Sequence, residues 1–223
     1  MNIKLFISAI TKFLLGVILV ALLVFLPAGT IRFTNGIIFM TVLFVPMFIA
    51  GIIMMIRSPK LLESRLNAKE KLSEQGLVIK LSGLMFIAGF ILAGLNYRFS
   101  WYMLPKAVTY VGVALFLIAY ILYAEVLREN AYLSRTIEVR EGQTVVSTGL
   151  YGVVRHPMYS ATLILFVSIP LILGSIYALI IFLAYPFIIA KRIKGEEKFL
   201  EESLDGYKEY RKKVKYKLIP FIW

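Results

Sequence analysis

Five apolar runs constrain the fold of this chain more than any other feature. They cover residues 6–27, 36–56, 77–95, 102–127 and 160–190. A helix needs about 20 apolar residues to cross a hydrocarbon core about 30 Å thick, and apolar side chains make up 60% of the sequence. The runs therefore predict an all-α, multi-pass integral membrane protein. Because the first run is one of a series and lacks a small-residue cleavage site, we do not expect it to be a signal peptide.

The last run is too long for one upright helix, since 31 residues at about 1.5 Å each would extend about 46 Å. Pro170 and Gly174 lie near its middle and interrupt the helical pattern. They favour a tight hairpin of two shorter helices, with one long kinked helix as the alternative. The chain is thus expected to have five to six transmembrane helices.

Basic residues distinguish the two sides of the membrane. The N-terminus, loops 57–76 and 128–155 and the segment 191–217 carry 21 Lys and Arg, against three in loops 28–35 and 96–106. The positive-inside rule places both termini, these loops and the polar chemistry in the cytoplasm. The net charge of +12 therefore requires no nucleic-acid partner. The absence of cysteine excludes disulfides, thiolate catalysis and Cys-ligated metals.

Two of the cytoplasmic segments have internal order. Residues 136–147 alternate β-branched and polar side chains about Gly142, which predicts a small β-hairpin. The tail carries Leu200, Leu204, Tyr207, Tyr210 and Val214 at helical spacing. It is expected to form two short amphipathic helices separated by Gly206 and ended by Pro220.

The only histidine, His156, lies in the sequence GLYGVVRHPMYS, residues 149–160. Pro157 suits the first turn of a helix, so the backbone of residues 151–156 is expected to be irregular. Irregular backbone at membrane depth is tolerated where it is buried in protein or lines a cavity, which predicts a ligand site here. The alternative is an interfacial belt, with Tyr and His at headgroup level and Arg155 reaching to phosphates.

Just past the last run, Arg192 and Glu196 are four residues apart and share a helix face. Glu197 is the alternative to Glu196 if the helical register differs by one residue. With one histidine and no cysteine we expect no metal site. No Ser-His-Asp set and no GxGxxG fingerprint is evident.

The run EVLRENAYLSRTIEVREGQTVVSTGLYGVVRHPMYS, followed by the hairpin and by RIKGEEKFLEESLDGYKEYRKKVKYKLIP, resembles the isoprenylcysteine carboxyl methyltransferase family. The similarity covers about residues 125–221 and rests on the Arg-His-Pro-x-Tyr, Arg-Ile-x-x-Glu-Glu and Tyr-x-x-Tyr elements. It divides the chain into N-terminal helices, residues 1–127, which are expected to select the acceptor, and a methyltransferase region, residues 128–223.

The resemblance implies methyl transfer from S-adenosylmethionine to a lipid-borne acceptor at the membrane face, such as an isoprenylcysteine or another lipid carboxylate. It assigns Arg192 to the acceptor carboxylate. It assigns the following residues to the cofactor: Gln143, Thr144, Val145, Val146, Tyr151, His156, Pro157, Met158, Tyr159 and Glu196. The chain departs from the family pattern at Leu150, where the family usually has Pro, and at Ala161, where it usually has Gly.

A carboxylate acceptor is ionised at neutral pH, because its reference pKa is about 3.3–3.9, and it needs no general base. Three alternatives stay open at this stage. A phospholipid amine acceptor would need His156 or Glu196 as a base. Sterol-type reductases, which use a nicotinamide cofactor, have a similar tail. A scaffold with a basic tail on anionic lipid would explain the charge without any enzyme activity. The sequence leaves the oligomeric state open.

Overall fold

A computed structural model describes residues 3–66, 76–133 and 137–223 of the chain. Residues 67–75 of the predicted loop 57–76 and residue 136 of the predicted hairpin lie outside the described residues. The helices are α1 (Ile3–Ala28), α2 (Thr34–Arg57), α3 (Pro59–Leu66), α4 (Gly76–Arg98), α5 (Lys106–Glu129), the 3₁₀ turn η2 (Gly149–Gly152), α6 (Pro157–Leu173), α7 (Ile176–Phe182), α8 (Tyr185–Ser203) and α9 (Tyr207–Lys213).

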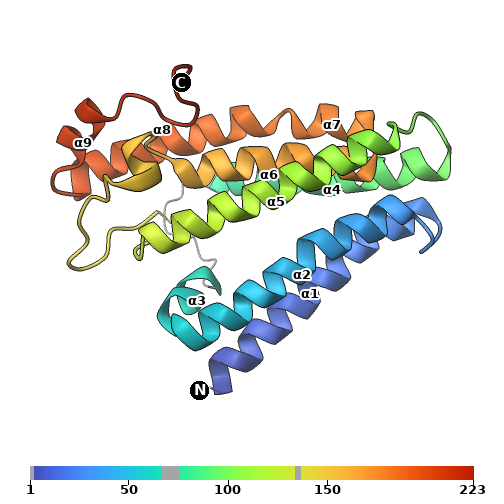
Figure 1. The fold of residues 1–223 in the computed structure, drawn as a ribbon, viewed down its shortest axis with the longest axis horizontal. Coiled ribbons are helices and arrows are strands. Elements are labelled where there is room, and N and C mark those ends of the chain that lie inside the picture. The colour runs from blue at the N-terminus through green and yellow to red at the C-terminus, as the bar shows by residue number, and fades with distance from the viewer. Residues whose placement is uncertain (1–2, 67–75, 134–136) are drawn as a thin grey trace.

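Five helical segments within the described residues are long and apolar enough to cross a membrane, which confirms the predicted fold class. They are α1, α2, α4, α5 and the segment Ile176–Ser203 that comprises α7 and α8, and α6 is a shorter apolar helix. Figure 1 shows α4 to α8 as one elongated bundle, with the α1–α2 hairpin inclined against it.

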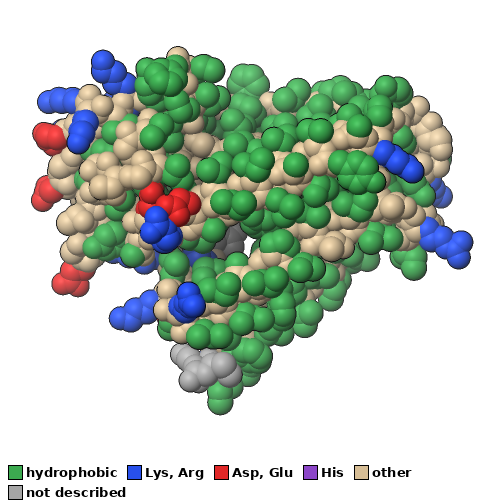
Figure 2. Space-filling view, in the orientation of Figure 1, with side chains coloured by type: hydrophobic (Ala, Val, Ile, Leu, Met, Phe, Trp, Pro, Cys, Tyr) green, Lys and Arg blue, Asp and Glu red, His purple; other side chains and the backbone are tan. Residues whose placement is uncertain are grey.

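The segments predicted to share one side of the membrane lie at one end of the bundle. The start of α1, α3, the loop after α5, α9 and the C-terminus are on the left of Figure 1, and the α1–α2, α4–α5 and α6–α7 links are on the right. The acidic side chains visible in Figure 2 gather at the left end, while hydrophobic side chains cover the helices in between. We call the left end the charged end.

The long apolar run 160–190 forms a helical hairpin, as predicted. Gly174 ends α6 in the left-handed conformation, with φ 72°, which glycine adopts at little cost. The Ser175 side chain then caps α7 by accepting a hydrogen bond from the Ala178 N–H at 3.2 Å. The turn lies at Gly174 and Ser175, and Pro170 stays inside α6. α7 ends at Phe182, and α8 continues in its direction to the charged end.

Three details of the prediction were wrong. The described residues 137–147 contain a turn, in which the Gln143 N–H donates to the Arg140 carbonyl at 3.0 Å, but no strands. Their apolar side chains Val139 and Val145 pack on the tail instead, and a lone two-stranded hairpin is only marginally stable. The fourth span begins at Lys106 after Pro105 rather than at residue 102. The tail begins as a continuation of α8, and its second helix ends at Lys213 rather than Pro220.

Aromatic rings hold the bundle together where α2, α4, α5 and α7 meet. The Phe39 ring lies 5.6 Å from Phe90 and 6.3 Å from Phe116 between centroids, and Phe182 lies 6.1 Å from Phe90. Tilted and edge-to-face pairs at such distances contribute about 0.5–1.5 kcal/mol each beyond their buried area. This core fixes the helices whose ends carry the cavity described next.

Candidate functional site

A cavity opens at the charged end, between the loop that follows α5 and the tail. Its walls come from residues 130–133 and 137–146, from η2, from Arg155, His156 and the start of α6, from α8, and from Leu204 and α9. The space within it, including open solvent at its mouth, is about 830 Å³. Its walls combine apolar and polar side chains, as those of small-molecule sites do.

The end of α5 fixes the loop that forms one wall. Both carboxylate oxygens of Glu129 accept the Leu150 N–H, at 3.1 and 3.0 Å. Asn130 Nδ2 donates to the Tyr151 hydroxyl at 3.0 Å. Gly149 has φ 53°, and a Cβ atom at this position would overlap the Glu129 carboxylate. Two residues at the end of α5 therefore position η2 and Tyr151.

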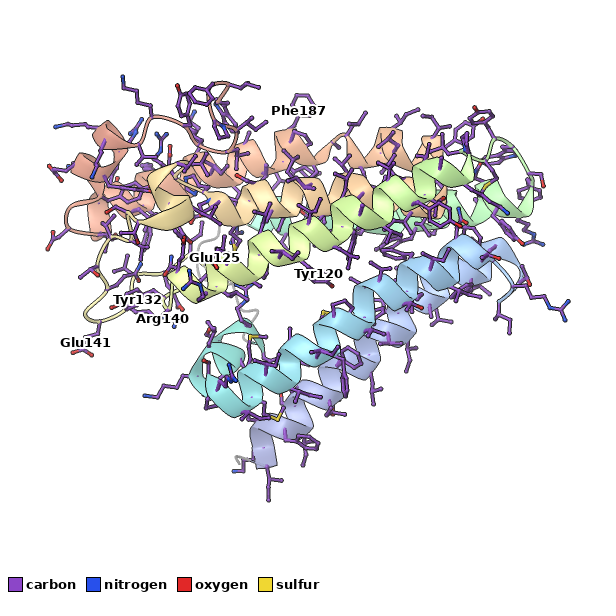
Figure 3. All side chains as sticks on the ribbon, in the orientation of Figure 1. Tyr120, Glu125, Tyr132, Arg140, Glu141 and Phe187 are labelled. Atoms are coloured by element: carbon purple, nitrogen blue, oxygen red, sulfur yellow. The ribbon has the colours of Figure 1, made fainter. Side chains whose placement is uncertain are left out.

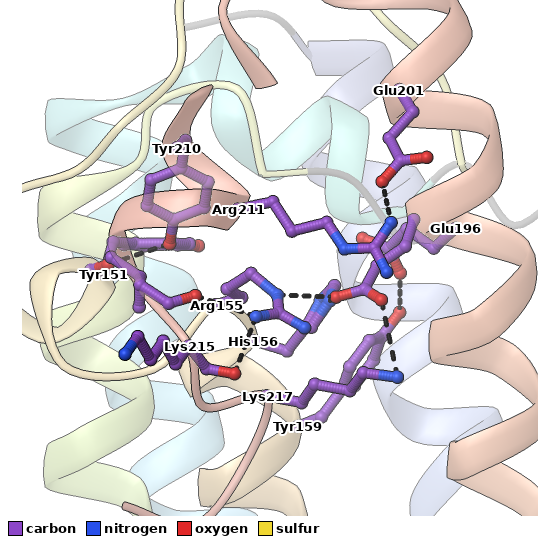
Figure 4. Close-up of polar contacts among 12 residues, drawn as sticks. Tyr151, Arg155, His156, Tyr159, Glu196, Glu201, Tyr210, Arg211, Lys215 and Lys217 are labelled. Atoms are coloured by element: carbon purple, nitrogen blue, oxygen red, sulfur yellow. Dashed lines mark hydrogen bonds and ion pairs between the residues drawn. The ribbon is translucent and has the colours of Figure 1, made fainter. Parts of the chain in front are cut away.

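A buried cluster of charged and polar side chains includes Arg155 and His156, which line the cavity (Figure 4). Glu197 Oε1 accepts from Arg155 Nε at 2.7 Å and lies 3.3 Å from His156 Nε2. Lys217 Nζ lies 3.5 Å from Glu197 Oε2. Arg155, His156 and Glu197 are only 6%, 5% and 5% exposed. Because an unpaired buried charge is strongly unfavourable, each member of the cluster depends on the others.

The chain after α9 closes over this cluster, and we call residues 214–218 the strap. Its carbonyl oxygens accept from the start of α6 and the residues before it. Arg155 Nη1 donates to the carbonyls of Val214 at 2.7 Å and Lys215 at 2.8 Å. The backbone N–H of Arg155 donates to Tyr216, and that of His156 donates to Lys217, both at 2.9 Å. Ser160 Oγ donates to the Leu218 carbonyl at 2.6 Å. The cavity wall at Arg155 and His156 is thus built jointly with the strap.

Tyr159 links the two polar residues of α8 that face the cavity. Its hydroxyl accepts from Arg192 Nε at 2.8 Å and donates to Glu196 Oε2 at 2.5 Å. The Tyr159 ring also stacks on His156, with centroids 5.7 Å apart and an interplanar angle of 24°. A cation and an anion are thereby held at the cavity wall by one phenol.

Three tyrosines form a further wall, and burial raises the pKa of each. The pKa of Tyr151 is raised to about 12, and those of Tyr207 and Tyr210 are raised above their ordinary value. The Tyr210 hydroxyl donates to the Tyr151 carbonyl at 2.8 Å. The Tyr207 hydroxyl is buried and has no hydrogen-bond partner in the described part of the chain. A buried hydroxyl without a partner costs about 1–3 kcal/mol, so a bound ligand could satisfy it.

The structure brings all the sequence-predicted site residues except Pro157 to the cavity wall. Those at the wall are Gln143, Thr144, Val145, Val146, Tyr151, His156, Met158, Tyr159, Arg192 and Glu196. Pro157 is buried and is the first residue of α6, as its helix-starting role predicted. Of the two adjacent glutamates, Glu196 lines the cavity, while Glu197 is not among the lining residues and pairs with Arg155.

Sequence reasoning missed several residues that line the cavity, among them Asn130, Tyr207 and Tyr210. The two tyrosines were assigned to the apolar stripe of the tail, and they do belong to its buried cluster. Their hydroxyls, spaced as Tyr-x-x-Tyr, were the available signal. Asn130 gave no such signal. Among the described residues, no group of three or more His, Asp or Glu side chains could hold a metal ion.

Two comparisons with known proteins bear on this region. Residues 107–205 match the family described as phospholipid methyltransferase. A mouse protein described as Delta(14)-sterol reductase TM7SF2 is 29% identical over 91 residues, which cover 40% of this chain and 22% of that protein. The chain thus spans about a fifth of this relative's length. The family match supports a methyltransferase at a coarse level and does not specify isoprenylcysteine as the acceptor.

Proposed function

We propose that this chain is a membrane-embedded methyltransferase that uses S-adenosylmethionine to methylate a lipid-borne acceptor, with a carboxylate as the first candidate. One observation carries the proposal. The segment that matches the phospholipid methyltransferase family, residues 107–205, supplies every wall of the cavity except α9. We further propose, from the distribution of basic residues, that the charged end faces the cytoplasm.

The cavity wall suits the chemistry of this cofactor. S-adenosylmethionine has a cationic sulfonium, an amino group, a ribose and an aromatic base. Glu196 and Tyr207 both line the cavity. In this proposal Glu196 would accept a hydrogen bond from the amine or the ribose, and the Tyr207 hydroxyl would be a further partner. Val145, Val146 and Leu200 provide apolar wall for the base. The cavity therefore combines apolar surface with a few polar groups, as small-molecule sites do.

When bound, S-adenosylmethionine would supply a methyl group from its sulfonium. An acceptor carboxylate oxygen would form the new O–CH₃ bond, and the electron pair of the broken S–CH₃ bond would stay on sulfur. No proton moves in this step, which requires no general base. Arg192 would position the carboxylate by paired hydrogen bonds, and Tyr159 keeps its guanidinium at the wall. His156 would order the wall through Glu197 and the strap rather than transfer protons.

A phospholipid amine is the second candidate acceptor, because the matching family is described by phospholipid methylation. An ammonium must lose a proton before it can attack, so His156 or Glu196 would then serve as the base. The pH profile separates the two acceptors. A carboxylate acceptor gives a rate that is flat from about pH 6 to 9, whereas an amine acceptor gives a rate that rises with pH as the ammonium deprotonates.

The nicotinamide alternative is suggested by the mouse relative described as a sterol reductase. Calorimetric titration of the detergent-solubilised protein with S-adenosylhomocysteine and, separately, NADPH distinguishes the two. We expect micromolar binding of the adenosyl compound alone, lost in His156→Ala and Glu196→Ala and retained in Glu201→Gln, whose carboxylate pairs with Arg211 outside the cavity. Binding of NADPH instead would favour a reductase, and binding of neither by folded protein would favour a scaffold.

The roles of the two α8 residues can be separated in the same way. Arg192→Ala should weaken use of the acceptor more than binding of S-adenosylhomocysteine, and Glu196→Ala should do the reverse. If both variants changed only the free energy of unfolding, the assigned roles would be wrong.

A further inference from the structure

The last five residues of the chain form an exposed apolar projection beyond the strap, and we call residues 219–223 the tip. Phe221 and Ile222 are 87% and 77% exposed, and Ile219 and Trp223 are 39% and 40% exposed. These residues adjoin a strap that is hydrogen-bonded to the cavity wall. An apolar projection of this kind at the charged end needs an environment other than water.

The tip is closed on itself through its own backbone. The N–H groups of Leu218 and Ile219 donate to the Trp223 carbonyl at 2.9 and 3.0 Å, and those of Ile222 and Trp223 donate to the Ile219 carbonyl at 3.1 Å. Pro220 has no N–H to satisfy. The N–H groups of Leu218, Ile219, Ile222 and Trp223 are therefore satisfied within residues 218–223. This lowers the free-energy cost of moving this backbone out of water.

Basic side chains flank the tip. Lys212, Lys213 and Lys215 are exposed on the preceding residues, and Lys217 Nζ lies 5.2 Å from the centre of the Trp223 ring. An aromatic residue beside several lysines is typical of a segment that sits at the headgroup level of anionic lipid.

The tip also lies where a bilayer surface would be. In Figure 1 the C-terminus is at the outer side of α8, near the charged end of the apolar helices. Phe187, which is 80% exposed, points outward from the same side of α8 in Figure 3. The tip therefore continues the lipid-exposed face of this helix toward the headgroups.

We propose that the tip inserts into the headgroup region of the leaflet at the charged end, while Lys212, Lys213 and Lys215 contact the phosphates of anionic lipids. The bilayer then holds the strap against Arg155, His156 and Ser160, whose hydrogen bonds end on strap carbonyls. The lipid surface is thus a structural partner of the cavity wall. This inference does not depend on the reaction that the cavity carries out.

Tryptophan fluorescence tests the insertion directly, because the chain has two tryptophans, Trp101 and Trp223. A Trp101→Phe protein reports on the tip alone. This variant is reconstituted into vesicles of phosphatidylcholine and phosphatidylglycerol. Its Trp223 emission should fall about twofold when the acyl chains are brominated, because interfacial segments lie about 5–10 Å deep at the headgroup and acyl boundary. Adding Phe221→Ser and Ile222→Ser should remove most of this quenching. Equal emission in brominated and unbrominated vesicles would overturn the proposal.

A second experiment tests the role of the lysines. In the Trp101→Phe protein, replacing phosphatidylglycerol by phosphatidylcholine should reduce the quenching by brominated lipid. When Lys212→Gln, Lys213→Gln and Lys215→Gln are added together, the quenching should no longer depend on that replacement. Unchanged quenching in both lipid compositions before any lysine is replaced would refute the role of anionic lipid. Thermal unfolding of each variant identifies loss of the fold, and Lys217 is kept because it contacts Glu197.

Discussion

Glu196 and Glu197 are adjacent and chemically identical, but Glu196 lines the cavity while Glu197 pairs with the buried Arg155. Replacing each glutamate by glutamine tests these two environments separately. Glu197→Gln removes the negative charge that faces Arg155, His156 and Lys217. Breaking a buried ion pair costs about 3–5 kcal/mol. The amide oxygen can still accept from Arg155 Nε, so we expect a loss near the lower limit, about 3 kcal/mol, or a fall in the unfolding midpoint of about 6–12 °C.

Glu196→Gln should act on binding instead. This carboxylate lines the cavity and accepts from the Tyr159 hydroxyl, a bond that the amide oxygen can also make, so the free energy of unfolding should change by less than about 1 kcal/mol. Losing a charged partner for the cofactor removes about 1.5–3 kcal/mol of binding free energy. At about 1.4 kcal/mol for each tenfold change, the affinity for S-adenosylhomocysteine should fall about 10- to 100-fold.

Thermal unfolding and calorimetric titration of the two variants, measured in one detergent, check both halves of this prediction. The reasoning requires opposite profiles, with stability lost in Glu197→Gln and affinity lost in Glu196→Gln. Equal stability of both variants would refute the buried cluster, and unchanged affinity in Glu196→Gln would refute its assignment to the cofactor.

Three further outcomes are expected. Tyr207→Phe removes a buried hydroxyl that has no partner in the described chain, so the free energy of unfolding should stay the same or rise. The affinity for S-adenosylhomocysteine, measured by calorimetry, should fall about 2- to 10-fold. Unchanged affinity would place this hydroxyl outside the binding site. Gly149→Ala should lower the free energy of unfolding by about 3 kcal/mol, because the added Cβ displaces the Glu129 carboxylate. Gly142 also has a positive φ, 71°, but open space around it, so Gly142→Ala should lower it by about 1 kcal/mol. Equal losses in thermal unfolding would contradict the role of Gly149. Burial raises the pKa of Tyr151 to about 12, above the reference value near 10. The protonated hydroxyl therefore contributes stability that is fully present below about pH 10 and is lost as the pH rises from about 10 to 12. Unfolding measured across this window should show a smaller decline in Tyr151→Phe, and an identical decline would refute the shift.

The membrane architecture could be predicted because apolar length and charge asymmetry follow from the bilayer itself. The turn at Gly174 could also be predicted, since an apolar run that is too long for one span must break where the helix pattern is weakest. The predicted β-hairpin failed for a specific reason. The apolar and polar residues alternate in 137–147 because some side chains, such as Val139 and Val145, pack on the tail. The alternation does not reflect pairing between strands.

Most of the cavity wall could be predicted where its residues lie close together in sequence, as they do from Gln143 to Tyr159. The contacts across longer separations could not. Glu196 and Glu197 differ by about 100° around α8, and the rotation of that helix is set by tertiary packing. The partnership of Arg155 with the strap spans about 60 residues and leaves no periodic pattern in the sequence.

The dependence of Arg155 and His156 on the strap also fixes when the cavity can be completed during synthesis. Chains emerge from the ribosome N-terminus first, so all the apolar helices are made before residues 214–218 exist. Until then the Arg155 guanidinium lacks the carbonyls that later accept its hydrogen bonds. A chain that ends after α9 would therefore contain all the apolar helices but lack the carbonyls that complete the cavity wall at Arg155 and His156.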